Sequence, residues 1–200
     1  MGKVYPQQSP SSSSSTTTGS PSRRETFTIW MKSLVLHGNG CTVYNSSGEI
    51  VYRIDNYHEK GRDEVDLMDF QGNLLFTIRR KKLPLFGCWE GYRSNKEKPW
   101  FQVKKLSRRS LKGKSSYKVI VGCDKAQQSF YTIELITGKS AGYRILQNDS
   151  GNLVAEVKQK QSSSGVSLGN DVLNLVVEPN VDHSLVMGIV TVYGLISNKL

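Results

Sequence analysis

The longest apolar run in this sequence of 200 residues is DHSLVMGIVTVYGLI, at residues 182–196. It has no charged residue between Asp182 and Lys199. A membrane-spanning helix needs roughly 20 apolar residues, and this run has about a dozen. If the run is helical, it is apolar on nearly every face, which is typical of a helix surrounded by protein. Asp182 or Ser184 would then cap its N-terminus. The run therefore predicts a buried core element.

Local propensity leaves a buried strand as an alternative for the same run. Val, Ile and Thr are frequent in it, and such β-branched residues favour strands. Gly188 and Gly194 also weaken a helix. Composition alone does not separate the two structures, so the preceding sequence has to be considered.

The sequence before this run consists of short β-rich segments separated by similar turns. Three turns begin with Asn or Asp and carry glycine at the fourth position, at residues 45–48, 69–72 and 148–151. Glycine accepts a positive φ without steric cost, so each turn predicts a β-hairpin. Residues 27–30, 100–105, 117–122, 130–136 and 172–177 predict further strands. Short strands with turn signals and no amphipathic helix indicate a barrel or a sandwich.

A barrel favours the helical interpretation of the C-terminal run. A small barrel has to fill its interior with side chains alone or with an enclosed element. A single apolar helix would do so, with Gly188 and Gly194 letting crowded strands approach it. Each large apolar side chain buried in this way contributes about 1.5–3 kcal/mol.

The N-terminal residues 1–24 differ in composition from the remainder. They are rich in Ser, Thr, Pro and Gln, which predicts a disordered tail followed by one domain over residues 25–200. A tail poor in acidic residues also resembles an organelle transit peptide, which is the alternative. There is no secretory h-region and no CxxC pair, so we expect a reducing, cytoplasmic setting. We expect Cys41, Cys88 and Cys123 to be small buried hydrophobes.

Positive charge is concentrated in one part of the chain. The formal net charge is +10, and residues 79–118 carry fourteen Lys or Arg against Glu90 and Glu97, a local balance of +12. The other residues therefore sum to about −2. The candidate partners of such a basic face are an anionic membrane surface, nucleic acid or an acidic protein. The alternative is a solvated surface without a specific ligand.

The second half of this basic segment contains the candidate binding residues. Our hypothesis is that an anionic lipid headgroup binds to Lys104, Lys105, Arg108, Arg109 and Lys112. Near an anionic bilayer each cation can contribute about 1 kcal/mol. Such binding would be reversible and would place the protein peripherally at the plasma membrane, whereas nucleic-acid binding through the same face would place it in the nucleus.

Other motifs do not predict catalysis. The G-x-S-x-G pattern at residues 165–169 lacks the strand before it and the helix after it that a nucleophile elbow needs. His37, His58 and His183 have no metal-ligand spacing, and we expect His183 to help cap the last helix. There is no P-loop and no dinucleotide fingerprint. We therefore expect a monomeric protein without enzymatic activity, cofactor or metal.

Motifs along the chain carry a family resemblance. In order, they are FTIWMKSL (27–34), GCTVY (40–44), YRIDNY (52–57), LMD (67–69), TIRRK (77–81), WEGY (89–92) and DVLNLVV (171–177), followed by Met187 and Gly188. This series, from about Glu25 to the C-terminus, resembles the LURP-one-related family of plants. The resemblance implies the fold shared by the Tubby C-terminal domain and the phospholipid scramblases. That fold is a closed antiparallel β-barrel of about 12 strands around a hydrophobic C-terminal helix.

The same resemblance implies a class of function. It suggests a non-enzymatic binding or tethering protein, associated with plant defence, that binds phosphoinositides or another anionic membrane lipid. The alternative is a membrane-tethered, transcription-related or nucleic-acid-binding protein. Scramblase-like lipid movement is disfavoured because no segment is long enough to be a transmembrane helix. The protein partner is unknown.

Overall fold

The protein is described from a computed structural model that covers residues 23–31, 40–55, 63–81, 87–94, 96–106, 116–138, 141–162 and 168–197. The long strands and helices are β1 (Glu25–Trp30), β2 (Gly40–Tyr44), β3 (Ile50–Asp55), β4 (Glu64–Asp69), β5 (Leu74–Lys81), β6 (Cys88–Tyr92), β7 (Phe101–Lys105), β8 (Ser116–Val121), β9 (Ser129–Ile136), β10 (Gly142–Gln147), β11 (Leu153–Gln159), β12 (Val172–Val177) and α1 (His183–Ile196). A short 3₁₀-helix, η1 (Lys125–Gln127), precedes β9.

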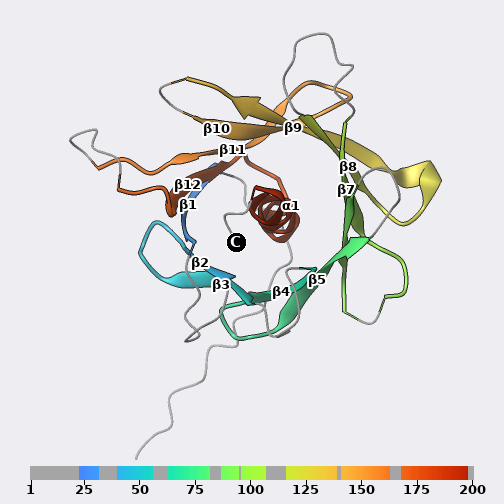
Figure 1. Cartoon of the computed structure of the whole chain (residues 1–200), viewed down its shortest axis with the longest axis horizontal. Coiled ribbons are helices and arrows are strands. Elements are labelled where there is room, and N and C mark those ends of the chain that lie inside the picture. Colours follow the sequence, from blue (N-terminus) through green and yellow to red (C-terminus); the bar gives the residue numbers. More distant parts are fainter. Residues whose placement is uncertain are drawn as a thin grey trace, which may run out of the picture.

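The twelve strands form one closed barrel in which each strand pairs antiparallel with its neighbours in sequence. The first and last strands close it, with Ile29 of β1 directly opposite Leu173 of β12 on one side and Val43 of β2 on the other. Figure 1 shows the strands as a ring with α1 inside it. The predicted closed antiparallel barrel around a buried C-terminal helix is confirmed.

The three predicted hairpin turns are also confirmed. Gly48, Gly72 and Gly151 have φ values of 80°, 87° and 68°, and each hairpin has a register shift next to its turn. The Oδ1 atoms of Asn45 and Asp69 each accept two backbone N–H groups at 2.8–2.9 Å. The four residues of each turn therefore determine locally how the two strands of that hairpin pair.

Strand β6 was not predicted from the strand patterns, because its sequence CWEGY contains a glutamate and a glycine, which are both depleted in strands. Gly91 is required there by close packing. A Cβ on Gly91 would lie 2.1 Å from Cε1 of Phe101, so the phenyl ring occupies the space that a side chain would need. Low local propensity is thus overridden by a tertiary contact.

The helix α1 begins at a capped N-terminus. The cap is Asp182, whose Oδ1 accepts hydrogen bonds from the backbone N–H of Leu185 at 3.2 Å and from the hydroxyl of Ser184 at 2.5 Å. The expectation that His183 helps to cap the helix is wrong. His183 is the first helical residue, and its imidazole packs edge-on against Phe27 at a centroid distance of 5.2 Å.

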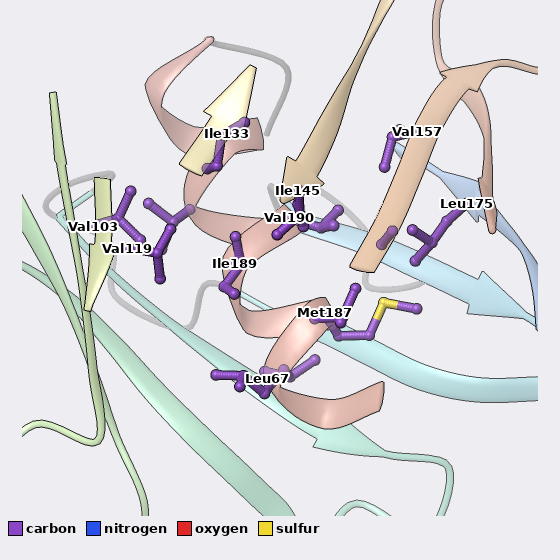
Figure 2. Packing of buried hydrophobic residues seen from close by; sticks show 14 of the residues in the cluster. Leu67, Val103, Val119, Ile133, Ile145, Val157, Leu175, Met187, Ile189 and Val190 are labelled. Carbon is purple, nitrogen blue, oxygen red and sulfur yellow. The ribbon is translucent and has the colours of Figure 1, made fainter. Parts of the chain in front are cut away.

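The core lies between α1 and the inward side chains of the barrel wall. On the helix, Val186, Ile189 and Val192 are at most 1 % exposed, and they meet wall residues such as Leu67 and Ile145 that are fully buried. Figure 2 shows wall residues such as Leu67, Ile133 and Ile145 around Ile189 and Val190 of the helix. No helix within the described ranges is both long and apolar enough to cross a membrane.

Closure of the barrel explains why the run is a helix and not a strand. Every strand edge is already paired within the ring, so an enclosed strand would leave its N–H and C=O groups without partners. A helix satisfies these groups internally. Even the one buried hydroxyl of the run is satisfied, since Thr191 donates to the carbonyl of Met187 at 2.8 Å.

The close approach predicted for Gly188 is confirmed. A Cβ there would lie 2.9 Å from Cε1 of Phe101, the ring that also covers Gly91. Phe101 meets Phe76 edge-on at 5.3 Å between ring centroids. The ring is therefore held between the wall and the helix. Gly194 is buried as well.

Candidate anion-binding surface

Strand alternation places Lys104 on the outer face of the barrel. Its neighbour Val103 and the residue opposite, Val119, are both fully buried and point inward. Because successive side chains in a strand alternate between faces, Lys104 of β7 and Lys118 of β8 point outward. These two lysines lie directly opposite each other in the antiparallel pair.

A third lysine continues this arrangement on β5. Lys81 lies opposite Cys88 of β6, and Cys88 lies opposite Lys104. Lys81, Lys104 and Lys118 therefore stand on one line across β5 to β8, which we call the lysine row. Adjacent strands are about 4.8 Å apart, so the row extends over roughly 14 Å.

The other predicted site residues are placed differently. Lys105 lies opposite Tyr117, whose ring contacts Tyr193 of the enclosed helix. Residues directly opposite each other share a face, so Lys105 stands on the inward side at the end of the barrel. Arg108, Arg109 and Lys112 lie outside the described residues. The structure therefore brings Lys104 together with Lys81 and Lys118, and it separates Lys104 from Lys105.

One carboxylate lies beneath the row. Glu90 of β6 is only 5 % exposed. It accepts hydrogen bonds from the hydroxyl of Tyr92 at 2.7 Å and from Nε2 of Gln102 at 2.9 Å, and Nζ of Lys81 is 3.5 Å away. The carboxylate of Glu90 thus accepts hydrogen bonds from two neutral side chains, and its negative charge offsets the positive charge of Lys81.

The remaining two lysines of the row make no ion pair with any residue in the described ranges. Nζ of Lys118 lies 4.6 Å from the centroid of the Phe130 ring, a cation–π contact that leaves its charge uncompensated. Lys104 and Lys81 are close enough to Cys88 to affect the pKa of its thiol. Burial raises the pKa of the Cys88 thiol, while the two ammonium groups act in the opposite direction.

Several cations elsewhere on the outer wall are paired with carboxylates. The pairs Arg79–Glu64, Arg144–Glu156 and Lys158–Glu156 all have N–O distances of 2.7 Å. The hydrogen bond from Lys158, and more weakly that from Arg144, lowers the pKa of Glu156 although burial opposes this. These three cations therefore carry less uncompensated charge than Lys104 and Lys118 of the lysine row.

A hollow of about 560 Å³ adjoins the row over β5 and β6. It is lined by Leu74, Thr77, Arg79, Tyr92, Arg93, Ser94, Lys96 and Glu97. Both guanidinium groups are already engaged. Arg79 pairs with Glu64, and Arg93 lies 3.3 Å from Asp182 and stacks 4.3 Å above the Trp100 ring. The hollow can extend the anion-binding surface.

Sequence reasoning missed Lys81 and Lys118 as partners of Lys104. Parity within one strand can be read from alternation, so Lys104 and Lys105 could have been assigned to opposite faces. The partner of Lys104 could not be identified, because the connection between β7 and β8 is ten residues long and leaves the register open.

The structure also shows where the cysteines lie and covers part of the G-x-S-x-G pattern. Cys41 and Cys88 are buried as predicted, but the prediction is wrong for Cys123, which is exposed at the loop after β8. Within the described ranges, no group of three or more His, Cys, Asp or Glu side chains could hold a metal ion. Residues 165–167 of the G-x-S-x-G pattern lie outside the residues that the structure describes.

Comparisons with known proteins agree with the resemblance seen in the motifs. The LURP-one-related family model matches residues 25–194. The chain is 46 % identical to LURP-one-related 4 of Arabidopsis thaliana, over 98 % of this chain and 87 % of that protein. It is 42 % identical to LURP-one-related 11 of the same plant, over 98 % and 89 %. These are family names and not names of enzymes.

A solved structure supports the fold independently. A crystal structure of an Arabidopsis thaliana protein superposes with a TM-score of 0.56 at 15 % identity, covering 86 % of this chain and 91 % of that one. At this identity the likeness concerns the fold alone. From the match of the family model to most of the domain and the identity to these relatives, the chain belongs to the LURP-one-related family.

Proposed function

We propose that this protein is a non-enzymatic binding module that docks reversibly on anionic membrane surfaces through the lysine row. The observation that carries the proposal is the alignment of Lys81, Lys104 and Lys118 on the outer face of neighbouring strands, with Glu90 as the one carboxylate among them. Like charges directly opposite each other in a sheet are destabilising. An anionic partner would reduce the repulsion between Lys104 and Lys118, so the arrangement is suited to binding anions.

The charge available sets the strength of binding. Each cation near an anionic bilayer contributes about 1 kcal/mol, so the two lysines without an ion pair, Lys104 and Lys118, contribute about 2 kcal/mol, which is roughly a 30-fold gain in partitioning. This gain suits reversible recruitment and is too small for a permanent anchor. A row of ammonium groups is attracted to any surface of high negative charge density, so membranes with either phosphatidylserine or phosphoinositides should bind.

Co-sedimentation with liposomes tests the proposal. The full chain should sediment with vesicles of phosphatidylcholine that contain phosphatidylserine or phosphatidylinositol bisphosphate, and not with phosphatidylcholine alone. The double variant Lys104→Glu/Lys118→Glu should lose this binding. Lys158→Glu/Lys160→Glu, at the end of β11 and three strands away from β8, makes the same change in net charge and should bind considerably better than the row variant. Circular dichroism confirms that each variant is folded.

The results separate the proposal from its alternatives. Equal loss in both double variants would show that net charge and not the row is responsible, and unchanged binding of the row variant would remove the row altogether. Binding to duplex DNA without lipid binding, with an affinity that falls steeply with salt, would instead favour the nucleic-acid function. The association with plant defence stays a prediction.

A further inference from the structure

A cavity of about 310 Å³ lies at one end of the barrel, and none of the lysines of the row lines it. Its walls come from the ends of β9 and β11, from the starts of β10 and β12 and from the second half of α1. Leu135, Val157 and Leu173 supply apolar wall, and Tyr143 and Tyr193 supply aromatic wall. Sites for small molecules measure about 300–1,000 Å³ and combine apolar walls with a few polar groups, so the cavity is large enough for a small ligand.

The aromatic wall is already assembled. The rings of Tyr143 and Tyr193 lie 4.2 Å apart between centroids with a 44° tilt, and Tyr193 meets Tyr117 edge-on at 5.8 Å. These contacts connect the wall strands β8 and β10 through the helix. Aromatic pairs of this kind restrict each other's orientation. A ligand would therefore meet a preformed surface.

Tyr143 carries a hydroxyl group without a protein partner. The residue is only 5 % exposed, and its hydroxyl makes no hydrogen bond to any residue that the structure describes. The hydroxyl oxygen is not sealed within the protein, so it is accessible from the cavity that Tyr143 lines. Burial raises the pKa of Tyr143 well above 10, so the hydroxyl keeps its proton and remains available as a donor. Because Tyr143 lines the cavity, an occupant of the cavity can supply the missing partner.

The lining does not favour an anion. Lys158 is the one charged residue among the described lining residues, and its Nζ is 2.7 Å from Oε2 of Glu156. Gln159 is committed too, since its Nε2 donates to the carbonyl of Gly169 at 2.8 Å and to Oδ1 of Asn170 at 2.9 Å. No uncompensated cation among them could stabilise a buried negative charge.

We propose that this cavity binds a neutral, mostly apolar small molecule with one hydroxyl or carbonyl group, which accepts a hydrogen bond from the hydroxyl of Tyr143. The apolar body of the ligand lies against Leu135, Val157 and Leu173. This site is independent of membrane docking, because it uses β9 to β12 and α1, whereas the lysine row uses β5 to β8.

Three probes of one shape test the class of ligand in NMR titrations of the full chain. They are p-cresol, toluene, which lacks the hydroxyl, and p-toluate, which is an anion. We expect p-cresol to bind with a Kd on the order of 1 mM and to shift resonances of the cavity lining. Toluene at matched concentration should give weaker shifts of the same resonances, and p-toluate none. Stronger binding of p-toluate, or the absence of shifts at the cavity with p-cresol, would overturn the proposal.

Two variants test the residues. Tyr143→Phe should weaken p-cresol binding about tenfold, to the level of toluene, and leave toluene binding unchanged. Leu135→Trp fills the cavity and should abolish binding of both probes, whereas Leu74→Trp, the same change at a half-exposed position on β5, should not. Equal affinity of wild type and Tyr143→Phe for p-cresol would disprove the hydrogen bond. Liposome binding by Tyr143→Phe should equal that of wild type, which keeps the two proposals separable.

Discussion

The phenyl ring of Phe101 makes the packing between wall and helix testable through Gly91. In Gly91→Ala, the new Cβ would lie 2.1 Å from Cε1 and 2.3 Å from Cζ of the ring. Ordinary carbon contacts are about 3.5–4.0 Å, so the ring would have to move by more than 1 Å. The same ring atoms also face Gly188 of α1, where a Cβ would lie 2.9 Å from Cε1, so the helix restricts how far the ring can move.

The magnitude follows from two opposing effects. Overpacking of a core costs about 1–3 kcal/mol, and this overlap belongs at the upper end. Replacing a strand glycine with alanine returns about 0.5–1 kcal/mol. The free energy of unfolding of Gly91→Ala should therefore decrease by about 2 kcal/mol, which lowers the Tm by roughly 4–8 °C in a domain of this size.

Urea unfolding monitored by tryptophan fluorescence measures the effect, and a double variant identifies its cause. Phe101→Leu alone should cost about 1–2 kcal/mol. If the ring is the obstacle, Gly91→Ala/Phe101→Leu should be no less stable than Phe101→Leu alone, a coupling of about 2 kcal/mol. Gly87→Ala is the matched control, since a Cβ there meets only Arg80 at 3.7 Å and should change stability by less than about 0.5 kcal/mol.

Two results would refute this reasoning. One is a Gly91→Ala variant as stable as Gly87→Ala. The other is additivity of the Gly91 and Phe101 changes, which would mean that the ring does not limit the space at Gly91.

Three further predictions concern α1. Val190→Asp buries an unpaired charge inside the barrel, where Val190 is 3 % exposed, and should unfold the domain; a folded variant by circular dichroism would show that the helix is placed wrongly. Asp182→Ala removes the N-cap and should cost about 1 kcal/mol in urea unfolding, whereas Asp182→Asn should recover most of this; equal loss would point to the ion pair with Arg93 instead. Burial lowers the pKa of His183 below 6.5, although Glu25 and Asp182 oppose the shift, so below about pH 6.5 the unfolded chain binds a proton that the folded chain does not. Stability should therefore fall as the pH decreases from about 7.5 to about 5.5, and the fall should be smaller in His183→Gln; identical pH profiles would contradict this.

Elements whose causes are local could be predicted from the residues. The turns at Asn45, Asp69 and Asn148 were predicted because glycine at a fixed offset permits the positive φ that a tight hairpin needs. Asp182 was predicted, with Ser184 as the alternative, to cap the apolar run that follows, and the cap is Asp182. Burial of that run followed from its lack of charge. Each of these signals is complete within a few neighbouring residues.

Features that depend on contacts between distant residues could not be predicted in this way. Strand β6 forms although Glu90 and Gly91 are poor strand formers, and Gly91 is required there because Phe101 packs against it. Closure of the barrel explains why α1 is a helix and not a strand, because a closed ring leaves no free strand edge for pairing. The candidate sites belong to the same class.

The lysine row depends on the register between β7 and β8, across a connection whose length does not specify it. The cavity depends on four strand ends that meet α1 at Tyr193. Local chemistry thus determined which segments fold into strands, turns and a buried run. Which side chains meet was settled by closing twelve strands around one helix, because closure sets every register at once.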